Sequence, residues 1–283
     1  MTRKSMTTAR MRAMKEKGEP ISMVTAYDYP SAQLAELAGA DFILVGDSLG
    51  NVVQGRDTTL SVTLDHMVYH TDLVARAVTV PYVVTDMPFA SYHGSADTTI
   101  AGAARIMREG GAKAVKMEGG REIVPSVQAA VHAGIPVMGH LGLTPQSVHA
   151  IGGYKIQGKQ SAAAQKLMDD ALRLEEAGVF SIVLELVTDE LAAAITERLS
   201  IPTIGIGSGN RCDGQVLVFH DILDYAANPY PKKIVKRYAN VGNVIREALA
   251  AYVADVKSRS FPADEHTFHM DEEEAQNLYG GAR

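Results

Sequence analysis

Short apolar runs recur along the chain and alternate with longer stretches in which apolar residues repeat at helical spacing. The runs are rich in β-branched residues, as strands buried on both faces are. They predict eight strands, at residues 21–25, 42–46, 82–85, 114–118, 137–140, 181–185, 203–206 and 215–219. The stretches between most of them predict helices, at residues 31–37, 64–78, 98–109, 123–133, 161–176 and 189–199.

Two patterns mark the boundaries of these elements. Glycine ends several helices, because it readily adopts the left-handed conformation that terminates a helix. Proline opens several strands, where its missing N–H interrupts no ladder hydrogen bond. The strict alternation of the two patterns predicts an α/β fold with one (β/α)8 TIM barrel. A doubly wound open sheet is the alternative, but no Gly-x-Gly-x-x-Gly turn follows an early strand.

The chain continues beyond the predicted barrel at both ends. Thr7 or Thr8 can cap a helix that Gly18 ends, whereas an organelle transit peptide is the other reading of this basic segment. Residues 234–258 predict a further helix. No linker-like composition divides the chain, so we expect one domain over residues 1–261, including the N-terminal helix, and a polar acidic C-terminal tail over residues 262–283.

Charge and composition narrow the function classes. The chain has 27 Lys and Arg against 33 Asp and Glu, a net charge of −6 that argues against nucleic acid or an anionic membrane as the main partner. The single cysteine, Cys212, excludes a disulfide framework or a cysteine-based zinc site. No apolar run is long enough to span a membrane, and we expect a cytoplasmic protein.

Candidate chemistry collects at the ends of the predicted strands, where TIM barrels carry their active sites. The residues at these ends are Asp47, Ser48, Asp86, Lys116, Glu118, His140 and Glu185. Buried acids held close together favour a hard cation such as Mg²⁺. Asp47 and Asp86 are the best candidate metal ligands, and Glu118 could complete the site directly or through water.

Glu185 differs from the other acids because it ends an apolar run and is followed by Leu186 and Val187. Apolar surroundings disfavour the charged form of a carboxylate, which suits a general base. The alternative is a strand-end acid that only pairs with Lys116. Two nearby segments are also candidates: the glycine-rich residues 205–209, as a phosphate-binding loop or a tight turn, and the long loop 141–160, as a lid or binding loop.

Several segments in colinear order between residues 5 and 260 resemble ketopantoate hydroxymethyltransferases. These segments are Thr25-Ala26-Tyr27-Asp28, Val45-Gly46-Asp47-Ser48-Leu49-Gly50, Asp86-Met87-Pro88-Phe89, Val115-Lys116-Met117-Glu118-Gly119-Gly120, Gly139-His140-Leu141-Gly142-Leu143-Thr144-Pro145-Gln146, Gly152-Gly153-Tyr154-Lys155, Gly205-Ile206-Gly207-Ser208-Gly209 and Asp213-Gly214-Gln215-Val216-Leu217-Val218. The resemblance implies a barrel of the phosphoenolpyruvate/pyruvate type that uses Mg²⁺. It also implies hydroxymethyl transfer from 5,10-methylenetetrahydrofolate to the 2-oxo acid 3-methyl-2-oxobutanoate, which makes ketopantoate for pantothenate and coenzyme A synthesis.

The same resemblance implies roles for individual residues. Asp47 and Asp86 would bind the metal and the oxo acid, with Glu118 as a further metal-shell acid. Ser48, Lys116 and His140 would bind the oxo acid, and Glu185 would be the catalytic base. The family typically forms a homo-oligomer, often a homodecamer.

Two other functions remain open at the level of sequence. One is a Mg²⁺-dependent lyase that cleaves a carbon–carbon bond in a 2-oxo or 2-hydroxy acid. Such lyases usually need a reactive cysteine on a mobile loop, and Cys212 lies outside the loop after the fourth strand. The other is a catalytically silent barrel that acts as a sensor or scaffold, which the fold alone does not exclude.

Overall fold

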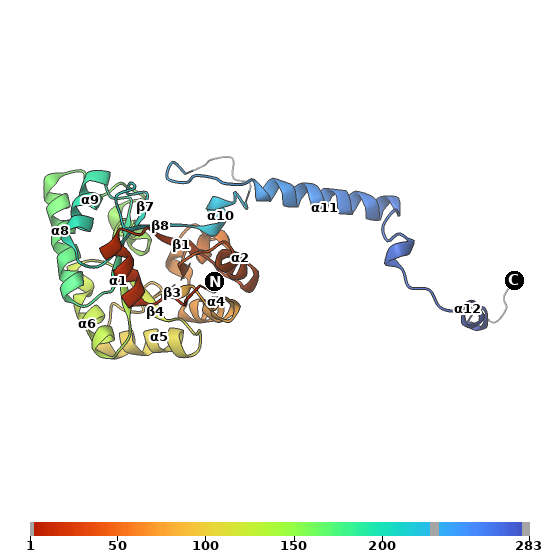
Figure 1. Cartoon of the computed structure of the whole chain (residues 1–283), viewed down its shortest axis with the longest axis horizontal. Helices are drawn as coiled ribbons and strands as arrows, with labels where there is room; N and C mark the ends of the chain where they lie inside the picture. The colour runs from red at the N-terminus through yellow and green to blue at the C-terminus, as the bar shows by residue number, and fades with distance from the viewer. Residues whose placement is uncertain (1–2, 227–231, 279–283) are drawn as a thin grey trace.

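The computed structural model describes residues 3–226 and 232–278, and its centre is a closed barrel of eight parallel strands in sequential order (Figure 1). The strands are β1 Ile21–Thr25, β2 Phe42–Val45, β3 Tyr82–Asp86, β4 Ala114–Glu118, β5 Val137–Gly142, β6 Ser181–Glu185, β7 Thr203–Ile206 and β8 Gly214–Leu217. β1 pairs with both β2 and β8, which closes the sheet. The predicted TIM barrel is confirmed, and each strand lies within two residues of its expected ends.

Helices cover the outside of the barrel (Figure 1). They are α2 Tyr29–Leu37, α4 Leu64–Ala77, α5 Ala96–Arg108, α6 Val124–His132, α8 Ser161–Glu176 and α9 Asp189–Arg198. Three short helices, α3 Leu49–Val52, α7 Val148–Ile151 and α10 Phe219–Ile222, belong to the segments that follow β2, β5 and β8. Two buried apolar clusters fill the space between strands and helices, one around α5 to α9 and one around α2 and α4.

Alternate residues of every strand point into the barrel, because successive side chains of a strand face opposite sides. The interior is apolar at the N-terminal ends and in the middle of the strands. They hold, among others, Met23, Leu44, Val84, Met138 and Val183, which come from five different strands and form one buried cluster. Two residues further along several strands, the inward-facing positions become polar. This change places the polar groups together at the C-terminal mouth of the barrel.

The helix α1, Thr8–Lys17, confirms the predicted N-terminal helix. Thr7 caps it by accepting a hydrogen bond from the Arg10 N–H at 3.1 Å, and Gly18 ends it in the left-handed conformation. Met6 and Met11 are buried in the apolar cluster of the barrel interior, so this segment seals the end of the barrel opposite to the mouth.

The C-terminal part departs from the sequence prediction. The expected helix over 234–258 is wrong at its start, since α11 spans Val241–Ser258. The preceding backbone is held in another way, because the Tyr238 N–H donates to the Ile222 carbonyl at 2.8 Å. α11 has no buried residue and extends away from the barrel towards the short helix α12, Glu272–Leu278 (Figure 1). Among the described residues, no helix is long and apolar enough to cross a membrane.

Candidate active site

A cavity of about 670 Å³ opens at the C-terminal ends of the strands. The seven site residues predicted from the sequence all line it: Asp47, Ser48, Asp86, Lys116, Glu118, His140 and Glu185. They gather there because the strand ends converge and the side chains alternate. Lys116 and Glu118 share the inward face of β4, while strand register sets Asp86 opposite Lys116 and His140 opposite Glu118.

Lys116 lies at the centre of a buried charge cluster. Its Nζ is 2.9 Å from Asp86 Oδ1 and 4.0 Å from Glu118 Oε1, and all three side chains are at most 4% exposed. Burial lowers the pKa of Lys116, but the attraction of Asp86, Glu118 and Asp47 outweighs burial and raises it. Lys116 is therefore a permanent cation facing the acids.

The carboxyl groups of Asp47 and Asp86 have raised pKa values. Burial is the largest cause for both, and repulsion from Glu118 adds to it. Burial also raises the pKa of Glu118, but His140 and Lys116 outweigh burial, so the pKa of Glu118 is lowered. The negative charge of three ionised acids, Asp47, Asp86 and Glu118, is therefore not balanced by Lys116 and His140 unless a further cation is present.

His140 connects this cluster to Glu185. Its Nδ1 is 3.0 Å from Lys116 Nζ and 3.3 Å from Glu118 Oε1, while its Nε2 is 3.3 Å from Glu185 Oε2. Burial and Lys116 lower the pKa of His140, but its contacts with Glu118 and Glu185 prevail and raise it to about 9. The Nε2 side of the ring therefore faces the carboxylate of Glu185.

Glu185 stands at the rim of the buried cluster, with its side chain 18% exposed. Its ion-pair partner in the described part of the chain is His140, and no ion pair joins it to Lys116, which was the alternative considered from the sequence. The next residue, Leu186, adopts a left-handed backbone conformation with φ of 49°. A conformation that is strained for leucine is found mainly where the surrounding structure requires it, as at functional sites.

Asp47 and Ser48 lie in the turn after β2 rather than within a strand. The Asp47 N–H donates to Asp86 Oδ2 at 3.0 Å, which fixes the turn against β3. Ser48 Oγ is 2.8 Å from the hydroxyl of Tyr27, a fully buried side chain that follows β1. Tyr27 belongs to the motif Thr25-Ala26-Tyr27-Asp28, but nothing in that motif indicates a contact with Ser48.

Gln146 and Tyr92 are the site residues that sequence reasoning missed. The Gln146 side chain reaches Asp47 Oδ2 at 2.8 Å, and its backbone N–H donates to Glu118 Oε2 at 3.0 Å. Both residues are buried. The sequence feature that could have pointed to Gln146 is its place in the Thr144-Pro145-Gln146 turn after β5. Tyr92 precedes α5 and belongs to none of the recognised motifs.

The donor set fits a hard divalent cation. Within the described residues, no three His, Cys, Asp or Glu side chains form a ready-made metal site. Asp86 Oδ1 nevertheless lies buried beside Lys116 Nζ at 2.9 Å, and the raised pKa values of Asp47 and Asp86 reflect burial and the repulsion of Glu118, which this one ammonium group does not offset. Carboxylate oxygens in this state are the ligands that Mg²⁺ prefers. The assignment of Asp47, Asp86 and Glu118 as metal ligands stays a prediction.

The glycine-rich segment 205–209 contains the end of β7 and the tight turn that follows it next to the cavity. Gly207 has a φ of 65°, and a side chain there would collide with Ile234 and Leu186. Ser208 Oγ donates to the Leu184 carbonyl at 2.8 Å and accepts from the Val187 N–H at 3.0 Å. The turn therefore supports the end of β6, just before and after Glu185.

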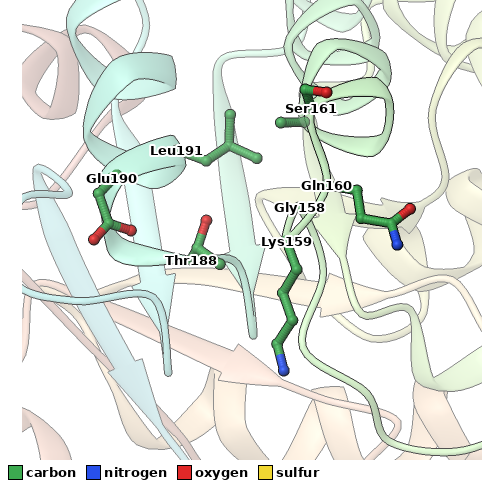
Figure 2. Close-up of a pocket in the computed structure, with 8 residues that line it drawn as sticks. Gly158, Lys159, Gln160, Ser161, Thr188, Glu190 and Leu191 are labelled. Carbon is green, nitrogen blue, oxygen red and sulfur yellow. The ribbon is translucent and has the colours of Figure 1, made fainter.

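The loop after β5 contributes to the outer wall of the cavity. Tyr154 and Ile156 line it from this loop, and Lys232 to Val235 line it from the segment before α11. A separate hollow of about 680 Å³ lies between the start of α8 and the start of α9 (Figure 2). Its charged lining residues, Lys159 and Glu190, are exposed, and none of the predicted site residues belongs to it.

Cys212 lies apart from the active-site cavity. Its thiol is within reach of Thr196 and Thr203, and burial raises its pKa. A buried thiol with a raised pKa is a poor nucleophile and a poor acid. This placement weakens the lyase alternative, which relies on a reactive cysteine at the mouth.

The chain is similar in sequence to enzymes of one family. The sequence pattern of ketopantoate hydroxymethyltransferases matches residues 5–264. A 3-methyl-2-oxobutanoate hydroxymethyltransferase of Geobacillus kaustophilus is 57% identical over 268 residues, which cover 95% of this chain and 96% of that protein. The enzyme of the same name from Bacillus pumilus is 54% identical over 270 residues, with the same coverage.

Solved structures agree on the fold at much lower identity. A phosphoenolpyruvate phosphomutase of Streptomyces platensis is 17% identical with a TM-score of 0.60, covering 98% of this chain and 96% of that one. A phosphonopyruvate hydrolase in complex with oxalate and Mg²⁺ is 16% identical with a TM-score of 0.58, at the same coverage. The family match over residues 5–264 and the 57% identity to the Geobacillus kaustophilus enzyme show that the chain belongs to the ketopantoate hydroxymethyltransferase family.

Proposed function

We propose that the protein transfers a hydroxymethyl group from 5,10-methylenetetrahydrofolate to 3-methyl-2-oxobutanoate and so forms ketopantoate for pantothenate and coenzyme A synthesis. The observation that carries the proposal is the arrangement of the cavity, in which Glu185 stands beside a buried cluster of Lys116, His140 and three acids. A 2-oxo acid needs such a site, because its charged end requires cations and its C3 proton requires a base.

Asp47, Asp86 and Glu118 would hold Mg²⁺. When bound, the ion supplies a Lewis acid that polarises the 2-oxo group and makes the C3 proton more acidic. A phosphonopyruvate hydrolase with the same fold was crystallised with oxalate and Mg²⁺, which supports a metal-assisted 2-oxo acid site in this kind of barrel.

Side chains of the cavity would remove the proton, stabilise the developing charge and bind the oxo acid. Glu185 removes the proton from C3, and the electron pair left on C3 attacks the one-carbon unit of the folate. Lys116 stabilises the negative charge that develops on the 2-oxo oxygen, while Ser48 and His140 help to bind the oxo acid. Over the whole reaction, one water supplies the oxygen of the new hydroxyl group and tetrahydrofolate is released.

Product formation tests the proposal directly. The protein is incubated with Mg²⁺, 3-methyl-2-oxobutanoate and 5,10-methylenetetrahydrofolate, and the products are followed by mass spectrometry. We expect ketopantoate and tetrahydrofolate in equal amounts. Cleavage of the oxo acid instead would favour the lyase, and binding of the oxo acid without turnover would favour a sensor or scaffold.

The outer cavity suits the folate donor. Tyr154, Ile156 and Ile234 offer apolar surface there, and Lys232 and Lys233 add positive charge at the rim. Lys232 is paired with Asp221 at 2.9 Å. Lys233 is exposed, and no ion pair within the described residues involves it. We propose that Lys233 attracts the glutamate carboxylates of the donor.

Replacing Lys233 with Gln should raise the KM for the folate donor about fivefold, the effect of losing one exposed ion pair of about 1 kcal/mol. The KM for the oxo acid and kcat should change little, and the effect should shrink at high salt because exposed charges are screened. Steady-state kinetics at low and high salt measure this. Lys257→Gln on α11 is the matched control, and an equal effect of both variants would refute the assignment.

The chain is proposed to be cytoplasmic and to assemble as a homo-oligomer, with a homodecamer as the expected state. Large apolar side chains that are exposed on α2 and α11 support assembly, namely Leu34, Leu37, Leu249 and Tyr252. Light scattering coupled to size-exclusion chromatography should give a mass close to ten chains. A mass of one chain over the working concentration range would contradict this part of the proposal.

A further inference from the structure

Gln146 uses every polar group of its side chain within the wall of the cavity. Nε2 donates to Asp47 Oδ2 at 2.8 Å and to the Met87 carbonyl at 2.9 Å, while Oε1 accepts from the Tyr92 hydroxyl at 2.8 Å. The residue is only 4% exposed. Its backbone N–H adds a fourth contact, to Glu118 Oε2 at 3.0 Å. One residue thus contacts two of the three acids in the cluster.

The surroundings determine which way the amide points. The Met87 carbonyl can only accept a hydrogen bond, so Nε2 must face it, and the second N–H of Nε2 then faces Asp47 Oδ2. The Tyr92 hydroxyl accepts from the Glu118 N–H at 3.0 Å, which leaves its own proton to donate, with Gln146 Oε1 at 2.8 Å as the nearer of its two acceptors. An amide with both a double donor and an acceptor is the group that satisfies this set, and a carboxylate or an apolar side chain does not.

We propose that Gln146 is a positioning residue that fixes the carboxylate planes of Asp47 and Glu118 for binding of a divalent cation. In each acid, Gln146 engages one oxygen, Oδ2 of Asp47 or Oε2 of Glu118, and the other oxygen remains for the cation or for the cluster. Groups that orient metal ligands in this way commonly change metal affinity by about 10- to 100-fold when they are removed. The inference rests on the proposed function, since it takes this cavity as the cation and oxo-acid site.

Gln146→Met tests the inference, because Met keeps the backbone N–H and approximate volume but removes the donors and the acceptor. The Mg²⁺ dissociation constant, measured by isothermal titration calorimetry without substrate, should rise about 10- to 100-fold. kcat should fall with it, and saturating Mg²⁺ should restore part of the loss. Gln165→Met is the matched control, since the exposed side chain of Gln165 bonds to Asp169 on the same helix, α8.

A merely structural role would lower the melting temperature of Gln146→Met and leave its Mg²⁺ dissociation constant unchanged well below that temperature. This result would overturn the inference. If Gln146→Met does not fold, Tyr92→Phe provides the test, because it frees Oε1 of the amide without touching Asp47. Its Mg²⁺ affinity should fall severalfold, and an unchanged affinity would equally overturn the inference.

The outcome for the wild-type protein separates this inference from the proposed function. If the wild type neither binds Mg²⁺ nor makes ketopantoate, the proposed function is wrong. If the wild type does both and Gln146→Met matches it in Mg²⁺ affinity, only the role of Gln146 is wrong.

Discussion

Glu185→Gln should slow exchange of the C3 proton of 3-methyl-2-oxobutanoate by about 10²- to 10⁴-fold, the contribution expected of a positioned general base. Gln has nearly the same shape as Glu but does not accept the proton. Binding of the oxo acid should change little, because the charged groups that would hold it belong to the cluster around Lys116. Exchange is measured by NMR in D₂O, and the dissociation constant of the oxo acid by calorimetry.

Glu190→Gln is the matched control for this prediction. Glu190 is an exposed acid in the first turn of α9 and lines the hollow outside the barrel mouth (Figure 2). Its removal should leave exchange at the wild-type rate. If Glu185→Gln retained the wild-type exchange rate with normal binding, another group would be the base.

Lys116→Met should produce the largest loss of stability among changes at the site. Lys116 is the cation that faces Asp86, Glu118 and Asp47, and its removal leaves buried carboxylates without compensation. Removing one partner of a buried ion pair lowers the free energy of unfolding by about 3–5 kcal/mol. We expect a loss of this size in the free energy of unfolding of the metal-free protein, measured by urea denaturation. Activity should also fall by about 10²- to 10³-fold, since the charge on the 2-oxo oxygen loses its donor.

A double-mutant cycle with Asp86→Asn separates pairing from packing. The double variant removes both charges of the closest pair, so it should regain part of the stability that Lys116→Met loses. Lys257→Met, an exposed change on α11, should leave stability within about 0.5 kcal/mol of the wild type. If Lys116→Met cost less than about 1 kcal/mol, Lys116 would not be the group that compensates the buried carboxylates.

The barrel was predictable because the signals for its strands and helices lie in short stretches of sequence. Each strand is a short apolar run bounded by proline or glycine, and the rule that TIM-barrel sites lie at strand ends directs attention to Asp86, Lys116, Glu118, His140 and Glu185. The alternation of side chains then places these groups on one inner face without further assumption.

The supporting residues were not predictable, because their partners are distant in sequence. Gln146 contacts Asp47 across 99 positions, and Tyr27 reaches Ser48 across 21 positions. Neither contact follows from hydrophobic periodicity. The late start of α11 has a similar cause, since the segment before it lines the mouth, with Ile234 next to Gly207, instead of continuing a helix.

We expect Glu185 and the Lys116 cluster together to remove a proton from C3 of a 2-oxo acid. The most direct test is ¹H NMR of 3-methyl-2-oxobutanoate with the wild-type protein and Mg²⁺ in D₂O, without any folate. We expect the C3 proton signal to disappear while the carbon skeleton stays intact. A C3 proton signal that persists although calorimetry shows the oxo acid bound would contradict it.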